Sequence, residues 1–167
     1  MFLDGSRSLF LLVFSGCLLG MVISCYLEYA VGLVPSPLCL AQRFCLMGLG
    51  ALSLLALLHA PGRRGRQLYA GLALGVALTG TVAALRQIWL QAGPPGSLPD
   101  CQSAGVLRNG TRAVTEVLQL VLHGRAECID VSWSLLGMTL PEWSLMLFIL
   151  LLGLCGWTLG CQKKPGC

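Results

Sequence analysis

The chain has 167 residues, of which 56% are hydrophobic and 11% are charged, and its formal net charge is +4. Soluble domains average about 25% charged residues, so this composition excludes an ordinary soluble protein and predicts an integral membrane protein. The small positive charge is explained by the segments that connect the membrane spans and does not indicate a nucleic-acid partner.

Four apolar segments approach the roughly 20 residues that a helix needs to cross a bilayer. They are Ser8 to Leu27, Leu40 to His59, Leu68 to Leu90 and Trp143 to Gly160. We expect the first to be retained rather than cleaved as a signal peptide, because no small-x-small cleavage pattern follows it. The sequence predicts an all-α membrane protein, a four-transmembrane-helix bundle that forms one domain over 1–167.

The distribution of basic residues predicts the orientation of this bundle. Three arginines and no acid lie between the second and third segments, and two lysines follow the fourth. These residues are Arg63, Arg64, Arg66, Lys163 and Lys164. Such clusters face the cytoplasm, so both termini are expected there and the connections 28–38 and 91–142 on the outer side.

Gly-x-x-x-Gly pairs occur in the first, third and fourth segments. They are Gly16 and Gly20, Gly71 and Gly75, and Gly156 and Gly160. Small residues at this spacing let membrane helices approach closely. We interpret all three pairs as contacts inside one bundle, in preference to homodimerisation.

A cysteine stands where the second apolar segment begins. Two prolines flank Ser36 and keep the chain extended before a helix can start. If the helix starts near Leu38, the amide groups of its first turn lie close to the Cys39 sulfur and Arg43 follows one turn later. Both features favour the thiolate. Ser36 occupies the position at which a Cys-x-x-Cys pair would carry its other sulfur.

The third segment ends with Arg86 and Gln87, near the predicted outer interface. A charge at membrane depth is costly, so the arginine either extends to the headgroups or faces a polar site. In the second interpretation Arg86 and Gln87 line a ligand site at the depth of Cys39. The sequence leaves both interpretations open.

The long outer connection carries two cysteines around a short predicted helix. Proline and glycine from Gly93 onward predict a flexible arm that ends at Cys101. The apolar residues between Thr111 and Leu122 recur at helical spacing, which predicts an amphipathic helix too short to span the bilayer. This helix either lies on the membrane surface or packs as a cap on the bundle, and Cys128 follows it.

The nine cysteines fall into three groups. Those inside predicted helices are expected to be buried apolar residues, and those in the tail are expected to stay reduced. The helical group contains Cys17, Cys25, Cys45 and Cys155, and the tail group contains Cys161 and Cys167. The third group, on the outer side, contains Cys39, Cys101 and Cys128. An odd number on the outer side predicts a reactive thiol or exchange between disulfides. A resting disulfide between Cys101 and Cys128 is the simplest pairing, but pairing of Cys39 with either one stays open.

No metal site is predicted. The outer cysteines do not have the spacing of metal ligands. The two histidines, His59 and His123, are expected on opposite sides of the membrane.

Several stretches together resemble the disulfide bond formation protein B (DsbB) family over nearly the whole chain. They are Tyr26 to Arg43, Arg86 to Gln91, the loop cysteines, and Trp133 to Trp143. The resemblance implies a quinone-dependent thiol oxidase of the bacterial inner membrane, with outer loops in the periplasm. The family has cysteine at the position of Ser36, and often histidine at the position of Ala92.

The resemblance also implies a relay of electrons. A periplasmic thioredoxin-like oxidase of the DsbA type would attack a Cys101–Cys128 disulfide through Cys101, and Cys128 would then exchange with position 36. The Cys39 thiolate would pass electrons to ubiquinone or menaquinone, and so to the respiratory chain. Arg43 would stabilise the thiolate and the charge that grows on the quinone oxygen, and Arg86 and Gln87 would also bind the cofactor. Because serine forms no disulfide, the relay is expected to be impaired.

Two other classes of protein remain as alternatives. A vitamin K epoxide reductase-like enzyme also combines four helices with thiol chemistry, but it would need a Cys-x-x-Cys pair in the last helix, which is absent here. A non-enzymatic scaffold would use Cys101 and Cys128 only to staple its loop. Thiol labelling separates these classes, since a scaffold predicts an inert Cys39.

Overall fold

The computed structural model describes residues 5–30, 37–91, 134–135 and 138–161. Its elements are α1 (Gly5–Tyr29), α2 (Pro37–His59), α3 (Arg63–Gln91), β1 (Ser134–Leu135), β2 (Met138–Thr139) and α5 (Leu140–Cys161). The two short strands pair in antiparallel fashion. The amphipathic helix predicted at 111–122 lies outside the described residues, as do Ser36, Cys101 and Cys128.

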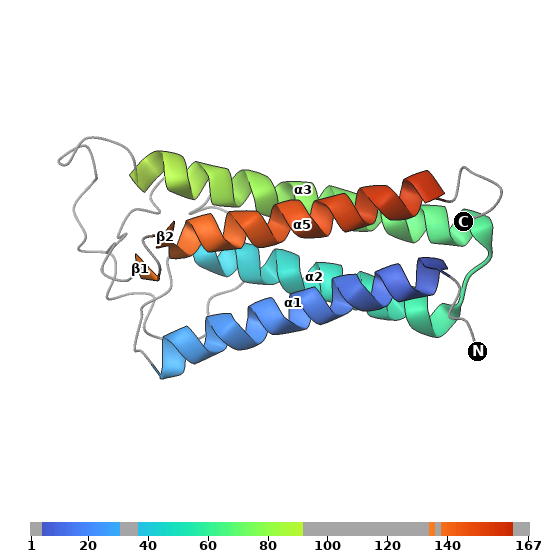
Figure 1. Ribbon diagram of the computed structural model, residues 1–167, viewed down its shortest axis with the longest axis horizontal. Helices are drawn as coiled ribbons and strands as arrows, with labels where there is room; N and C mark the ends of the chain where they lie inside the picture. Colours follow the sequence, from blue (N-terminus) through green and yellow to red (C-terminus); the bar gives the residue numbers. More distant parts are fainter. Residues whose placement is uncertain (1–4, 31–36, 92–133, 136–137, 162–167) are drawn as a thin grey trace.

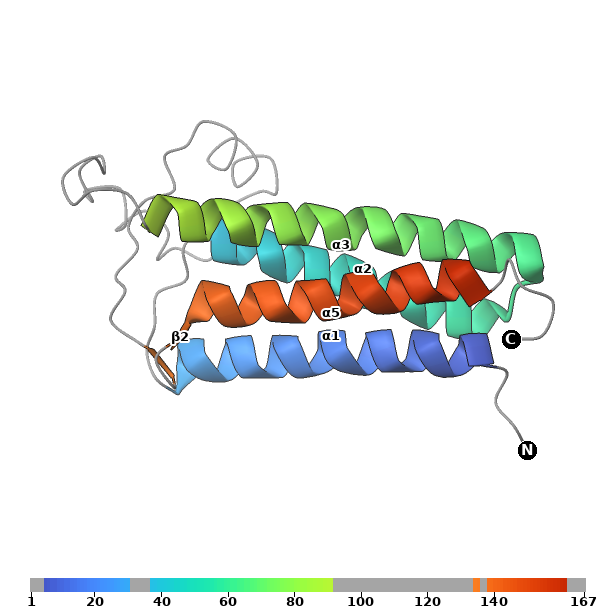
Figure 2. The same cartoon turned by 45° about the horizontal axis from the view of Figure 1, so that its top comes forward.

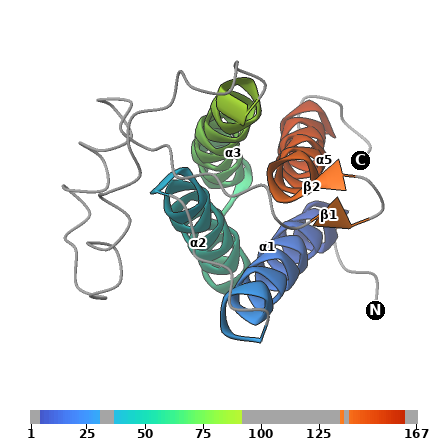
Figure 3. The ribbon, with the colours of Figure 1, turned by 90° about the vertical axis from the view of Figure 1, so that its left-hand side faces the viewer.

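The four long helices lie side by side along one axis (Figures 1 and 2). Each packs against the next helix in the chain, and α5 closes the ring by contacting α1, as the end-on view shows (Figure 3). At one end, called here the hairpin end, α2 and α5 begin beside the β1–β2 hairpin (Figure 1). The opposite end, where α2 ends and α3 begins, is called the basic end because Arg7, Arg63, Arg64 and Arg66 lie there.

All four helices are long and apolar enough to cross a membrane, by length and composition. Their outward faces carry many exposed large apolar side chains, among them Leu18, Leu19 and Val22 of α1. Such a surface suits hydrocarbon rather than water. The predicted four-helix membrane bundle is therefore confirmed.

The helices extend beyond the predicted segments at their polar ends. The three arginines expected in the second connection belong instead to the first turn of α3, and Glu28 belongs to α1 rather than to a loop. At the start of α5, the Thr139 backbone N–H donates a hydrogen bond of 2.6 Å to the Glu142 carboxylate. The Thr139 hydroxyl donates a second bond of 3.0 Å to the same carboxylate, and this capping by Glu142 explains why α5 begins at Leu140, before the apolar run itself.

The interior of the bundle is formed by small residues of α3 and larger residues of its neighbours. The main cluster contains Val13, Cys17, Leu46, Leu49, Ala73, Ala77, Phe148, Leu151 and Cys155. On α3 the buried face follows Ala70, Ala73, Ala77, Gly80 and Ala84, at helical spacings of three and four. Small residues on this face let α2 and α5 approach α3 closely.

The glycine-pair prediction holds for only one of three helices. Gly16 and Gly20 face Leu151 and Leu147 of α5, as predicted for contacts inside the bundle. A side-chain carbon added at any glycine of the α3 and α5 pairs would meet nothing within 4 Å. Those two pairs were wrongly assigned to the interior, because the alanine face of α3 makes its close contacts instead.

Gly80 provides a test of this packing. A Cβ atom at this position would collide with the ring of Phe148, which is fully buried. We expect Gly80→Ala to lower the free energy of unfolding by about 1–3 kcal/mol, the usual cost of overpacking. The matched control is Gly75→Ala, at an open position of the same helix, which should be neutral or stabilising by up to about 1 kcal/mol. Equal effects of the two substitutions in thermal unfolding would contradict the packing.

Candidate active site

Cys39 lies in the first turn of α2 at the hairpin end. The helix begins at Pro37, a residue whose fixed backbone angle and missing N–H suit the first helical position. Cys39 is therefore surrounded by first-turn amide groups without helical acceptors, as the sequence predicted. Its side chain is half-buried.

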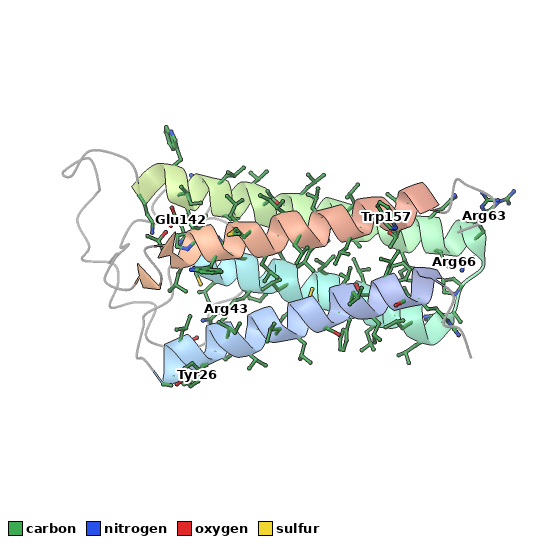
Figure 4. The ribbon with its side chains drawn as sticks, in the orientation of Figure 1. Tyr26, Arg43, Arg63, Arg66, Glu142 and Trp157 are labelled. Carbon is green, nitrogen blue, oxygen red and sulfur yellow. The ribbon has the colours of Figure 1, made fainter. Side chains whose placement is uncertain are left out.

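Arg43 follows Cys39 by one helical turn and extends across to α1 (Figure 4). Its Nε group donates a hydrogen bond of 2.6 Å to the Ser24 hydroxyl, and Nη2 donates one of 3.1 Å to the Ser24 carbonyl. Its Nη1 group forms an ion pair with the Glu28 carboxylate. Ser24 and Glu28 are one turn apart on α1, so a single face of that helix fixes the guanidinium.

The same residues influence the charge of the Cys39 sulfur. Arg43, Glu28 and Ser24 all act on it electrostatically or through hydrogen bonding. The side chains of Arg43 and Glu28 are only 15% and 28% exposed, so solvent screens the pair less than it would on an open surface. Burial of the sulfur is the largest influence and opposes negative charge on it; the guanidinium favours that charge, and the Glu28 carboxylate opposes it. The expectation that this position favours the thiolate therefore holds for the effect of Arg43 but not for the site as a whole.

A second polar contact lies deeper in the bundle, between α2 and α3. The Gln42 amide donates a hydrogen bond of 2.9 Å to the Gln87 side-chain oxygen. Both residues are almost completely buried, at 5% and 7% exposed. Leu38, one turn before Gln42, is fully buried. One face of α2, with Gln42, is therefore turned to α3, and another face, with Cys39 and Arg43, is turned to α1.

The structure therefore brings together some of the predicted site residues. Cys39 and Arg43 lie at one end of the bundle, and Gln87 lies at the same end through its bond to Gln42. Arg86 is half-buried on α3, next to Gln87. Position 36 and the two loop cysteines lie outside the described residues.

Sequence reasoning missed three polar residues of this site: Ser24, Glu28 and Gln42. One signal for Glu28 was present, because a carboxylate at the end of an apolar segment is costly unless it is paired. Gln42 gave a weaker signal as an amide inside the second span. Nothing in the sequence indicated that Ser24 would hold the arginine.

The polar groups at this end suit a quinone. A quinone has two carbonyl acceptors on an apolar ring, and the side chains of Arg43, Gln42 and Gln87 carry N–H groups at the hairpin end of an apolar bundle. Three of the five guanidinium N–H groups of Arg43 bond to α1, which fixes the orientation of the remaining donors. The donor set thus fits a carbonyl ligand beside Cys39.

A four-helix membrane bundle that holds a cysteine thiol beside an oriented guanidinium indicates the class of membrane proteins that carry out thiol redox chemistry. The family described as disulfide bond formation protein DsbB matches residues 6–158. The chain belongs to this DsbB family and is a membrane thiol-disulfide oxidoreductase. The vitamin K epoxide reductase-like and scaffold alternatives are not favoured.

Three relatives illustrate the similarity. Disulfide bond formation protein B of Stutzerimonas stutzeri is 43% identical over 157 residues, which cover 94% of this chain and 96% of that protein. Disulfide bond formation protein B 1 of Pseudomonas aeruginosa is 42% identical over 151 residues, with coverage of 90% and 93%. The Chromobacterium violaceum protein of the same description is 38% identical over 154 residues, with coverage of 92% and 91%.

Proposed function

We propose that this chain takes electrons from a periplasmic thioredoxin-like dithiol oxidase of the DsbA type and delivers them to ubiquinone or menaquinone. The single observation that carries this proposal is the placement of Cys39 beside Arg43 at one end of a membrane bundle. A thiol at that depth can meet a lipid-soluble oxidant, and family membership supplies the thiol-disulfide chemistry.

The first exchange uses the loop cysteines. The partner's dithiol attacks a Cys101–Cys128 disulfide through Cys101, the S–S bond of this chain breaks, and an S–S bond forms in the partner. Two electrons and two protons pass to Cys101 and Cys128, which become thiols. Their return to the disulfide requires a second redox pair at positions 36 and 39.

Arg43 and the two glutamines hold the site for the second exchange. When bound, the quinone supplies the oxidising power by accepting two electrons and two protons. Arg43 favours negative charge on the Cys39 sulfur, against the effects of burial and of the Glu28 carboxylate, and would offer positive charge to a nearby carbonyl oxygen. Gln87, which accepts a hydrogen bond from Gln42, would help to hold the quinone through its amide nitrogen, and Arg86 would contribute a cation at the same end of α3.

Ser36 limits this chain to part of the cycle. Serine has the size of cysteine but no sulfur, so no disulfide can form between positions 36 and 39. Oxidation of the partner then stops once the Cys101–Cys128 disulfide has been used. Cys39 stays a thiol or thiolate, or pairs with one of the loop cysteines.

We also propose that the protein lies in the bacterial inner membrane, with both termini in the cytoplasm and the hairpin end facing the periplasm. Arginines at the start of α3 and lysines after α5 support this orientation. In this orientation Cys39 lies on the same side as the loop cysteines and the soluble partner.

Protection of Cys39 from alkylation tests the proposed quinone site. We expect a short-chain ubiquinone analogue to slow iodoacetamide labelling of Cys39 in reduced protein, because the occupied site excludes the reagent. Labelling is located by peptide mass mapping, with half-buried Cys45 as the internal reference. The same protection in Cys45, or none in Cys39, would overturn the assignment. Loss of protection in Arg86→Leu would include Arg86 in the site.

A further inference from the structure

The hydroxyl group of Ser24 lies where α1 and α2 meet at the candidate active site. Ser24 is half-buried on α1, and its side-chain oxygen accepts the hydrogen bond of 2.6 Å from Arg43 Nε on α2. Its backbone carbonyl accepts a second bond, of 3.1 Å, from Arg43 Nη2. The same hydroxyl is close enough to the Cys39 sulfur to act on it by hydrogen bonding. Ser24 is therefore within reach of both the guanidinium and the thiol.

The direction of these hydrogen bonds follows from which groups can donate. A guanidinium carries only donors, so the Ser24 oxygen accepts from Arg43 and its own hydrogen points elsewhere. A thiolate can only accept, so a bond between Ser24 and an anionic Cys39 runs from the hydroxyl hydrogen to the sulfur. The bond from Arg43 thus leaves the hydroxyl hydrogen of Ser24 available to the sulfur.

Other hydroxyl groups in the described helices are bonded differently. Those of Ser15, Ser53 and Thr81 each donate to the carbonyl oxygen four residues earlier in their own helix. This is a common partner for the hydrogen of a hydroxyl group inside a helix. The oxygen of Ser24, in contrast, is bonded to a side chain of a neighbouring helix. Its position therefore indicates a role between α1 and α2.

The polar neighbours of Cys39 differ in the protonation state of the thiol that they can serve. Arg43 can only donate and favours the thiolate, whereas the ionised Glu28 carboxylate can only accept and opposes it. A hydroxyl group does both, because its oxygen has a second lone pair for the thiol hydrogen and its own hydrogen can turn to the thiolate. Ser24 can therefore stay bonded to the sulfur when the thiol loses its proton.

We propose that Ser24 is a further catalytic residue, whose hydroxyl group donates a hydrogen bond directly to the Cys39 thiolate. This bond is oriented by Arg43 but is separate from the charge of the guanidinium. It favours negative charge on a sulfur whose burial opposes that charge. The inference rests on the proposed role of Cys39 as the electron donor and names a residue that supports that role.

Alkylation of Cys39 in reduced protein without quinone tests this proposal. The rate of iodoacetamide labelling follows the fraction of thiolate, so Ser24→Ala should label about threefold to tenfold more slowly at neutral pH. Ser24→Thr keeps the hydroxyl group and should stay within about twofold of the unaltered chain. The matched control is Ser15→Ala on the same helix, whose hydroxyl bonds to the Leu11 carbonyl at 2.8 Å. Its effect on Cys39 should be less than about twofold.

A second background separates direct donation from the holding of Arg43. Ser24→Ala is introduced into protein that already carries Arg43→Leu. If Ser24 acted only by holding the guanidinium, it would have no further effect once the guanidinium is gone. Direct donation predicts that labelling of Cys39 slows by about threefold again in the double variant. An unchanged rate in this background overturns the proposal.

Two comparisons distinguish this chemistry from a change in structure. Half-buried Cys45 reports on opening of the bundle, and its labelling should stay within about twofold in every variant. Faster labelling of both cysteines in Ser24→Ala, or equally slow labelling of Cys39 in Ser24→Thr and Ser24→Ala, would mean that Ser24 only shapes the site and would overturn the proposal. Because quinone and partner protein are absent, failure of the quinone protection experiment would leave the bond from Ser24 standing.

Discussion

Ser36→Cys is expected to convert a single round of partner oxidation into continuous turnover. As it stands, the chain should form at most about one partner disulfide per molecule, because Cys101 and Cys128 have no second disulfide with which to exchange. With a pair at positions 36 and 39, steady-state oxidation should rise on the order of 10³-fold or more, the scale seen when a residue of covalent catalysis is restored. The measurement is the oxidation of reduced DsbA-type protein with excess quinone.

Two variants control this experiment. Ser36→Ala should behave like the unaltered chain, since neither side chain forms a disulfide. Ser36→Cys/Cys39→Ser should again stop after one round, because a lone cysteine at position 36 has no partner. A Ser36→Cys protein that stays at one round with quinone present would refute the relay. Continuous turnover of the unaltered chain would show that the pair is unnecessary.

Arg43→Leu and Glu28→Gln are expected to move the reactivity of Cys39 in opposite directions. Without the guanidinium, the sulfur loses its nearest cation and keeps a neighbouring carboxylate, so alkylation of Cys39 at neutral pH should slow about tenfold. In Glu28→Gln the carboxylate charge is removed while Ser24 still holds Arg43, so alkylation should become faster. Rates across a range of pH, followed by mass mapping, separate these outcomes.

The free energy of unfolding should fall in both variants. Opposite changes in the reactivity of Cys39 therefore cannot come from the loss of stability alone. The Arg43–Glu28 pair is partly buried, and loss of a hydrogen bond to a charged group costs about 2 kcal/mol. Arg43→Lys serves as the matched control, because it keeps the charge but cannot reproduce the three-point attachment to Ser24 and Glu28. Equal changes in Cys39 reactivity in Arg43→Leu and Glu28→Gln would mean that these residues act only on folding.

These two experiments address separate parts of the proposed relay. Position 36 decides whether electrons can leave the loop cysteines, whereas the Arg43–Glu28 pair sets how readily Cys39 becomes an anion. Glu28 is therefore a positioning residue: it holds the guanidinium and balances its charge, while its own carboxylate opposes negative charge on the sulfur. A Ser36→Cys protein provides the background in which both effects can also be read as turnover.

Local patterns were sufficient to predict the membrane class and the principal helices. Long apolar segments leave few other structures in a bilayer, because every backbone polar group must be bonded within its own segment. The prolines before Cys39 likewise predicted a helix start beside the thiol, and the spacing to Arg43 placed the two side chains on one face. The capping pair Thr139 and Glu142 is also a short-range signal, although it was not used to place the start of α5.

The contacts between helices were decided only by the tertiary structure. Sequence spacing shows which residues share a helix face, but not which face meets a neighbour, so Gly71 and Gly75 were placed inside while the alanine face of α3 is the buried one. The attachment of Arg43 to Ser24 and the Gln42–Gln87 bond depend on the order of helices around the ring. In a membrane both faces of a helix are apolar, so hydrophobic periodicity no longer marks the interior, and packing together with paired polar groups determines it.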